Sequence, residues 1–247
     1  MSNLNIKIFS DGADVKEMIL ADKENSVDGF TTNPTLMARA GITDYLGFAK
    51  EVLSNVKEKS ISFEVFSDDI SEMYDQAMTL NDLGSNVYVK IPVTNTKQEY
   101  TYDLVNRLSN ESVKLNVTAL FTKTHIDEVF SALNNKVPSI ISIFAGRIAN
   151  AGLDPEPTMM YASNLVKEYP VIETLWASSR EVFNIFQAER CGTDIITLPP
   201  NLISAMKDIG TDLDDFSLDT VKMFYKDSVA AGFKIWSSFI EIIIVKF

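Results

Sequence analysis

The chain has 247 residues, 46% of them hydrophobic and 23% charged, which is the composition of an ordinary globular protein with enough length for a full core. Its formal net charge of −12 disfavours nucleic acid and anionic membranes as general partners, because both select positive surfaces. One cysteine and one histidine exclude an intrachain disulfide framework and make histidine-rich or thiolate metal sites untenable.

The N-terminal sequence MSNLNIKIF lacks a charged segment followed by a long apolar run, so we expect no signal peptide. No stretch of the chain reaches the roughly 18 apolar residues that a membrane-spanning helix needs. The sequence therefore favours a cytoplasmic protein that does not bind membranes.

Short β-branched and apolar runs alternate with helical patterns along the whole chain. Between the runs, segments such as SDDISEMYDQAMTLNDLG and TKTHIDEVFSALNN carry apolar residues at three- and four-residue spacing, which is typical of amphipathic helices. Gly84 closes the first of these segments. In chain order, the predicted strands are Ile6–Asp11, Asp28–Asn33, Ile61–Phe66, Val87–Val93, Val113–Leu120, Ser139–Gly146, Ile172–Ser178 and Asp194–Pro199.

Regular alternation of strand and helix predicts a parallel sheet, and eight units in this length favour an α/β fold of the closed (β/α)8 TIM-barrel type, as a single domain. The alternative is an open doubly wound sheet. The segment SDGADVK after the first strand is not a glycine-rich dinucleotide-binding loop, which weakens that alternative.

The last predicted helix begins in FSLDTVKMFYKDSVAAG, with Ser217 as its N-cap, Phe216 and Val221 as a hydrophobic staple, and Gly232 at its end. We expect the barrel domain to span residues 1–233. Residues 234–247 form an apolar C-terminal tail, for which packing on the barrel or on a neighbouring subunit is the expected role.

The strand NVYVKIPVT, residues 86–94, carries a lysine in the middle of an apolar run. Val87, Val89 and Ile91 share one face, and Lys90 lies on the other. Burying an ammonium costs several kcal/mol, roughly, unless it is paired, loses its proton or has a function.

The same alternation places further polar residues on the inner parity of the other strands, late in each. The expected inward residues are Asp11, Thr31, Asn33, Ser62, Glu64, Phe66, Asn116, Thr118, Ser142, Phe144, Trp176 and Ser178, with Arg147 and Arg180 at the rim. Any one of these positions is explained equally well by a satisfied core hydroxyl or a buried salt bridge. Their convergence on one volume predicts a pocket, because so many buried polar groups would otherwise destabilise the fold.

A buried lysine has a specific chemistry. Burial disfavours the charged form, so a neutral amine becomes available to attack a substrate carbonyl and form a Schiff base. The iminium accepts electrons when a carbon–carbon bond breaks, and Asp11 and Glu64 fit the proton transfers that this reaction needs. Arg147 and Arg180, with the hydroxyls of Ser178 and Ser179, fit a phosphate.

These residues resemble the transaldolase family, in particular its short single-barrel branch, which also includes fructose-6-phosphate aldolase. The motif TTNPT at 31–35, the lysine strand VKIPVT, and the later strand ends NVTALF, FAGRI and ASSR carry the resemblance, in order and at family-like spacing. It covers about Lys7 to Phe233, nearly the whole chain.

The resemblance implies a role for each site residue. Lys90 would be the Schiff-base nucleophile, Asp11 the acid/base for carbon–carbon cleavage, and Glu64 with Thr118 would position the catalytic water. Asn33 and Asn116 would bind hydroxyls of a dihydroxyacetone unit, and Thr31 and Ser142 would line the site. Arg147, Ser178 and Arg180 would hold the sugar phosphate.

The resemblance also implies the reaction. It is the transfer of a dihydroxyacetone unit from sedoheptulose 7-phosphate or fructose 6-phosphate to glyceraldehyde 3-phosphate or erythrose 4-phosphate, in the pentose phosphate pathway. Similar aldolases carry Gln and Tyr where this chain has Glu64 and Phe144, which favours transfer over simple cleavage. The alternatives are a fructose-6-phosphate aldolase and, more distantly, a non-catalytic sugar-phosphate-binding barrel. The resemblance implies no metal and no organic cofactor, sugar phosphates as partners, and a homo-oligomer.

Overall fold

A computed structural model describes residues 4–235 of the chain. Contacts between Cα atoms divide the chain into two compact units, Ser2–Met206 and the segment from Lys207 onward, which are treated separately below. None of the helices in the described part combines the length and the apolar character needed to span a membrane.

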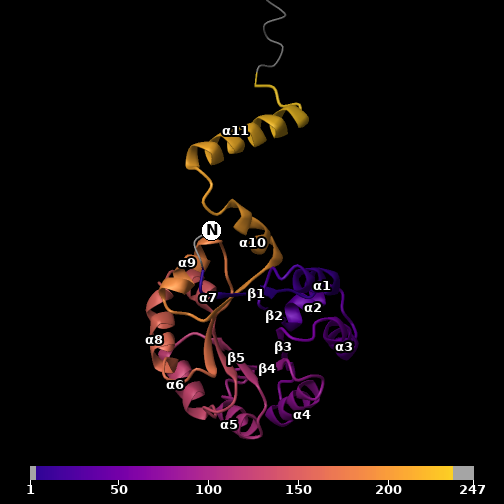
Figure 1. The fold of residues 1–247 in the computed structure, drawn as a ribbon, viewed down its shortest axis with the longest axis vertical. Helices are drawn as coiled ribbons and strands as arrows, with labels where there is room; N and C mark the ends of the chain where they lie inside the picture. Colours follow the sequence, from indigo (N-terminus) through magenta and orange to yellow (C-terminus); the bar gives the residue numbers. More distant parts are fainter. Residues whose placement is uncertain (1–3, 236–247) are drawn as a thin grey trace, which may run out of the picture. The chain divides into compact units, whose positions relative to one another are not determined.

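Within residues 4–235, eight strands pair in parallel, each with the next in the chain, and β8 pairs with β1 to close the ring. The first unit is therefore a TIM barrel, as the sequence predicted (Figure 1). All eight predicted strands are present, with ends that differ by at most three residues. They are β1 (Lys7–Asp11), β2 (Gly29–Thr31), β3 (Ser60–Glu64), β4 (Val87–Pro92), β5 (Leu115–Leu120), β6 (Ser139–Ile143), β7 (Ile172–Trp176) and β8 (Ile195–Leu198).

Helices follow the strands and cover the outside of the ring (Figure 1). Several begin at a side-chain cap: Asp14, Asp69 and Thr122 each accept a hydrogen bond from the first turn of the helix that follows. The helices of this unit are α1 (Val15–Lys23), α2 (Pro34–Arg39), α3 (Tyr45–Asn55), α4 (Ile70–Asn81), α5 (Tyr102–Asn110), α6 (Lys123–Ala132), α7 (Ala145–Asn150), α8 (Glu156–Val166), α9 (Phe183–Arg190) and α10 (Pro200–Ala205).

Two apolar clusters lie on opposite faces of the strands. The larger, outer cluster joins strand residues such as Ile61, Phe63 and Val89 to the helices. The inner cluster fills the barrel and consists of Phe9, Ile140, Leu175, Ala177 and Ile195. Burying a side chain of this size stabilises the fold by about 1.5–3 kcal/mol.

The inner cluster depends on one glycine. A Cβ on Gly29 would lie 2.6 Å from the Phe9 ring, so only glycine lets the ring fill the barrel beside β2.

The parity predicted for β7 is wrong. Leu175 and Ala177 face the barrel interior, whereas Trp176 packs in the outer cluster. Leu175 pairs in register with Ser142 of β6, and the Thr174 hydroxyl contacts Ser163 of α8, so the even-numbered residues of β7 face the helices. A run as apolar as TLWA reads equally well in either parity, and the register across the sheet decides it.

Phe66 was also expected inside the barrel, and this is wrong. The strand β3 ends at Glu64, and Phe66 lies beyond it with 60% of its surface exposed. Its ring packs against Tyr45 of α3, with the centroids 5.2 Å apart.

In the second unit, α11 (Leu213–Ala230) begins four residues before the N-cap predicted from the sequence. Asp212 is the cap and accepts from the backbone N–H groups of Asp214 and Asp215, so Ser217 lies inside the helix. Gly232 follows the end of the helix with φ of +66°, as expected of a terminating glycine. The tail predicted for 234–247 lies outside the described residues apart from residues 234–235, and the boundary at 233 stays a prediction.

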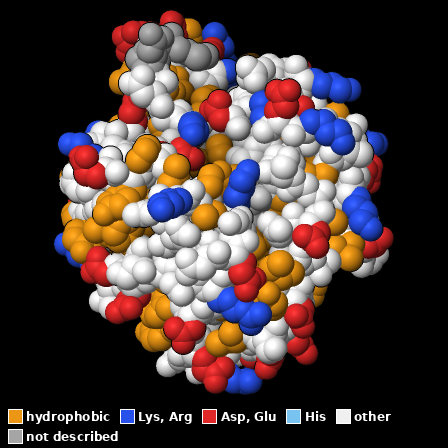
Figure 2. Space-filling view, turned by 60° about the horizontal axis from the view of Figure 1, so that its bottom comes forward, with side chains coloured by type: hydrophobic (Ala, Val, Ile, Leu, Met, Phe, Trp, Pro, Cys, Tyr) orange, Lys and Arg blue, Asp and Glu red, His pale blue; other side chains and the backbone are white. Residues whose placement is uncertain are grey.

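The chain has a net charge of −12, but its acidic side chains do not form one continuous patch on the face drawn in Figure 2. Acidic, basic and hydrophobic side chains are interspersed over that face. Any anion-binding group there must therefore come from a local arrangement of basic residues rather than from a general positive field.

Candidate active site

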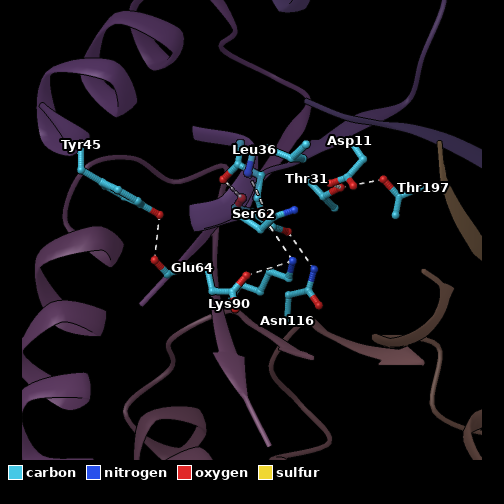
Figure 3. Close-up of polar contacts among 11 residues, drawn as sticks. Asp11, Thr31, Leu36, Tyr45, Ser62, Glu64, Lys90, Asn116 and Thr197 are labelled. Carbon is cyan, nitrogen blue, oxygen red and sulfur yellow. Dashed lines mark hydrogen bonds and ion pairs between the residues drawn. The ribbon is translucent and has the colours of Figure 1, made fainter. Parts of the chain in front are cut away.

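Lys90 of β4 and Glu64 of β3 form an ion pair inside the barrel (Figure 3). The two residues are register partners, and Lys90 Nζ lies 3.1 Å from Glu64 Oε2. The amine also donates to the carbonyl oxygen of Thr32 at 3.2 Å. The side chains of Lys90 and Glu64 are only 7% and 17% exposed, so the pair is largely shielded from water.

The surroundings of Lys90 follow from the pleat of β4. Val89 and Ile91 are buried in the outer cluster, and Tyr88, one inward position below Lys90, packs on the inner apolar cluster. The amine therefore lies above an apolar floor, with a carboxylate as its charged neighbour. If Glu64 accepts its proton, Lys90 becomes a neutral nucleophile in a site where both groups remain hydrogen-bonded.

Asp11, at the end of β1, faces the same volume. Burial raises the pKa of this carboxyl, and the positive charge of Lys90 and a hydrogen bond from Thr31 both oppose that rise. Thr31 Oγ1 donates to Asp11 Oδ1 at 2.8 Å and lies 2.6 Å from Thr197 Oγ1. A carboxylate with a raised pKa that still keeps a donor and a nearby cation is suited to accept and return a proton.

The neighbouring strand β5 carries two buried oxygens that have no hydrogen-bond partner among the described residues. Asn116 Nδ2 donates to Ser62 Oγ at 2.9 Å, but Asn116 Oδ1 and Thr118 Oγ1 are unpaired. Leaving such a group buried and unpaired costs about 1–3 kcal/mol. Because Asn116 is the register partner of Lys90, its unpaired oxygen lies next to the amine. A substrate or a water molecule bound there could form the missing hydrogen bond.

The backbone of β5 is irregular at the same place. The register with β6 shifts between Val117 and Leu120, and Ala119 has a φ of +61°. Bulges of this kind re-aim side chains near the ends of barrel strands. The irregularity next to Thr118 is therefore consistent with a site built at this point.

Two other predicted residues lie on the walls. Asn33 caps α2, and its Oδ1 accepts from the backbone N–H of Leu36 at 3.0 Å, which leaves its amide nitrogen as the group that can bind a substrate oxygen. Ser142 is buried on the inner parity of β6 beside Leu175. The cap on Asn33 could have been read from the sequence, since Pro34 follows it at the first helical position.

Two arginines follow the ends of β6 and β7, Arg147 in α7 and Arg180 in the loop before α9. Arg147 and Arg180 are both exposed, and a Cβ built on Gly146 would lie 3.4 Å from Arg180 Cγ. With the Asn150 amide oriented so that both its groups are satisfied, its oxygen accepts from Arg180 at 3.1 Å. Ser178 lies beyond the end of β7 with φ of +66°, so strand parity does not govern its direction.

Phe144 lies against Arg147, and Ser179 directly precedes Arg180 in the chain. Phe144 directly follows β6, and its ring packs against Phe121, with the ring centroids 5.8 Å apart, and lies 5.7 Å from the Arg147 guanidinium. Ser179 Oγ donates to the carbonyl oxygen of Thr197 at 2.9 Å, so this hydroxyl ties the loop to β8 and is not free for a ligand. The expectation that Ser179 helps to hold a phosphate is therefore wrong.

Three residues of the site were missed by the sequence. Thr197 contacts Thr31, the Thr32 carbonyl accepts from Lys90, and Tyr45 donates its hydroxyl to the Glu64 carbonyl oxygen at 2.7 Å. Thr197 could have been found by applying strand parity to β8, where Ile195 and Thr197 alternate with Ile196. Tyr45 had no signal of this kind, because it comes from a helix.

Comparison with known proteins agrees with this geometry. The family model described as "Transaldolase/Fructose-6-phosphate aldolase" matches residues 8–235. A protein named probable transaldolase from Dehalococcoides mccartyi is 32% identical over 202 residues, which are 81% of this chain and 90% of that protein. Its namesake from Thermoanaerobacter sp. is 30% identical over 231 residues, 93% of this chain and the full length of the relative.

A third probable transaldolase, from Nitrosopumilus maritimus, is 30% identical over 205 residues, covering 81% of this chain and 87% of the relative. The family match covers all eight strands except the first residue of β1, and with them every candidate site residue named above. The chain belongs to the transaldolase/fructose-6-phosphate aldolase family.

Proposed function

We propose that this protein is a transaldolase, which moves a dihydroxyacetone unit from a ketose phosphate to an aldose phosphate through a Schiff base on Lys90. The observation that carries the proposal is the buried Lys90 amine, paired with Glu64 at 3.1 Å and flanked by Asp11. Sedoheptulose 7-phosphate and fructose 6-phosphate are the proposed donors. Glyceraldehyde 3-phosphate and erythrose 4-phosphate are the proposed acceptors, as in the pentose phosphate pathway.

The first half of the reaction forms the Schiff base. Lys90 passes a proton to Glu64 and attacks the donor's C2 carbonyl to give a carbinolamine. Loss of the C2 oxygen as water leaves an iminium, and Glu64 supplies the proton that this water needs. The unpaired Thr118 hydroxyl lies one register step beyond Lys90 and is suited to hold that water.

The second half breaks and remakes a carbon–carbon bond. Asp11 accepts the proton of the C4 hydroxyl, the C3–C4 electron pair moves into the iminium, and the aldose phosphate leaves as an aldehyde. The three-carbon unit stays on Lys90 as an enamine. Its C3 then attacks the aldehyde carbon of the acceptor, the new hydroxyl takes its proton back from Asp11, and water releases the product from Lys90.

The remaining candidate residues bind the substrate in this scheme. The unpaired Asn116 oxygen and the free amide nitrogen of Asn33 bind hydroxyls of the three-carbon unit, and Thr31 and Ser142 line it. Arg147 and Arg180, with the Ser178 hydroxyl, bind the phosphate, since paired guanidinium groups recognise it with strong charge-assisted hydrogen bonds. We further propose that the protein acts in the cytoplasm as a homo-oligomer.

Borohydride trapping with fructose 6-phosphate tests the proposal. We expect a covalent reduced adduct on Lys90, identified by peptide mass spectrometry, and turnover that disappears in Lys90→Ala. Lys97→Ala is the matched control, because Lys97 is an exposed lysine just beyond the same strand, and it should trap normally. Trapping at another lysine, or equal activity in Lys90→Ala, would refute the proposal. An adduct also excludes a non-catalytic sugar-phosphate-binding barrel.

Transfer rather than simple aldol cleavage rests on Glu64 and Phe144. Phe144 offers no hydroxyl to the site, and Glu64 offers a carboxylate that pairs with Lys90. The double variant Glu64→Gln with Phe144→Tyr should raise the rate of dihydroxyacetone release relative to transfer, measured with and without an acceptor aldose. An unchanged ratio would show that these two positions do not set the outcome.

A further inference from the structure

Thr197 of β8 lies in a row with Thr31 and Asp11 inside the barrel (Figure 3). Its hydroxyl is 2.6 Å from that of Thr31, which in turn donates to the Asp11 carboxylate at 2.8 Å. Thr197 is 4% exposed and Thr31 2% exposed, so bulk water does not compete for these bonds. The three residues come from β8, β2 and β1, and β8 lies next to β1 only because the barrel closes.

Counting protons gives the row a direction. A hydroxyl has one proton, and the proton of Thr31 is used toward Asp11. The short contact between the two threonines can then be a hydrogen bond only if Thr197 is the donor and the Thr31 oxygen the acceptor. A hydroxyl that accepts one bond becomes a stronger donor in the next, because chains of hydrogen bonds polarise one another.

The backbone of Thr197 is held as well as its side chain. Its carbonyl oxygen accepts from Ser179 Oγ at 2.9 Å, and Ser179 lies between Ser178 and Arg180. The hydroxyl that reaches toward Asp11 is therefore fixed to the loop that carries the proposed phosphate ligands. A movement of that loop would therefore reach the Asp11 carboxylate through Thr197 and Thr31.

We propose that Thr197 is a positioning residue for proton transfer at Asp11, which donates to Thr31 and so keeps the Thr31 hydroxyl directed at the carboxylate. This inference rests on the proposed function, because it assigns Thr197 to the carbon–carbon cleavage step and not to Schiff-base formation. Thr197 touches neither the substrate nor Lys90 in this scheme and acts only through Thr31.

Few groups near Asp11 carry a charge that could change its pKa. The strands next to β1 carry no ionisable side chain, since β2 reads GFT and β8 reads IITL, and α10, which packs against β1, reads PNLISA. The charge that lowers the pKa of Asp11 is that of Lys90, itself paired with Glu64. The Thr31 hydrogen bond lowers it too, so weakening that bond should leave Asp11 protonated up to a higher pH.

The test compares Thr197→Val, which removes the hydroxyl with little change of shape, with Thr197→Ser, which keeps it. In Thr197→Val we expect kcat/KM for fructose 6-phosphate cleavage to fall by about tenfold near neutral pH, the factor that one ordinary hydrogen bond represents. The acidic limb of its pH profile of kcat/KM should move to higher pH. The difference in kcat/KM from the wild type should therefore become smaller in alkaline buffer. Thr197→Ser should restore both the rate and the profile.

The control is Thr193→Val, two residues before the start of β8, which removes a buried hydroxyl that has no partner in the described part of the chain and should leave the pH profile unchanged. An acidic limb in Thr197→Val that coincides with the wild type, or a Thr197→Ser variant that behaves like Thr197→Val, would overturn the inference. Borohydride trapping separates this failure from that of the proposed function. If the wild type forms the Lys90 adduct and Thr197→Val forms it at the same rate, the step lost is cleavage; a slower adduct in Thr197→Val would also contradict the assignment.

Discussion

Gly146 should be the most sensitive small residue of the proposed phosphate site. It lies in the first turn of α7, and a Cβ at this position would be 1.7 Å from the Ser178 carbonyl oxygen and 2.7 Å from the carbonyl carbon. The obstacle is backbone and cannot rotate away. The Ser178 peptide must retreat by at least 1.3 Å to reach the 3.0 Å that real Cβ atoms keep.

The size of the effect follows from this displacement. Gly146→Ala should cost about 1–3 kcal/mol of stability through overpacking. A misplacement of about 1 Å in a substrate-holding group lowers the rate by about 100-fold. Because Ser178 and Arg180 move while Lys90, Glu64 and Asp11 on other strands do not, the loss should fall on phosphorylated substrates.

The assay is kcat/KM for fructose 6-phosphate and for unphosphorylated fructose, measured on folded protein at a temperature below its melting transition. We expect a loss of about 100-fold with the phosphate ester and a much smaller one with fructose. Gly152→Ala is the matched control: it makes the same change just beyond the other end of α7, where a Cβ meets nothing within 4 Å. Its positive φ of +79° should lower stability without changing the preference for phosphate. Equal losses with both sugars, or no loss at all, would refute the reasoning.

Two further predictions concern stability. Burial raises the pKa of Asp11 above its ordinary 3.8, so the ionised carboxylate destabilises the folded state. This destabilisation is absent below the pKa that Asp11 has in the unfolded chain and complete above the pKa that it has in the folded protein. Asp11→Asn should therefore raise the free energy of unfolding at about pH 7 but not at about pH 3. The same variant should have no turnover. Urea unfolding at both pH values measures this, and an equal gain at both would contradict it. Tyr45→Phe removes the hydrogen bond to the Glu64 carbonyl and should lower the unfolding free energy by about 1 kcal/mol, with the ring still packed on Phe66. A urea midpoint that does not move would count against a structural role for this hydroxyl.

Strand parity alone could place the buried lysine of β4 on the inner face. In β3, β4 and β5 the apolar residues alternate with polar ones, so the positions of Glu64, Lys90 and Asn116 on the inner face could be read from the sequence. The eight-fold repeat of strand and helix was equally visible, because each unit is local and contains its own turn and cap signals. What these patterns fix is which way each strand faces.

These patterns do not determine the contacts between one strand and another. The parity of β7 was decided by its register with β6, and the direction of Ser178 by a left-handed backbone just past the strand end. Phe66 lies outside the barrel because β3 ends two residues before it, and its ring packs against Tyr45 of α3. The pattern of residues along a single strand contains none of this information.

The sequence by itself thus determined the barrel, the inner lysine and its two acidic neighbours, because alternation along one strand is enough to bury or expose a side chain. Only the tertiary structure decided that Thr197 meets Thr31 and Asp11, since that contact exists only where β8 pairs with β1 and the ring closes. The physical reason is that a periodic pattern encodes orientation within an element, whereas hydrogen bonds between elements depend on distances that the closed fold alone sets.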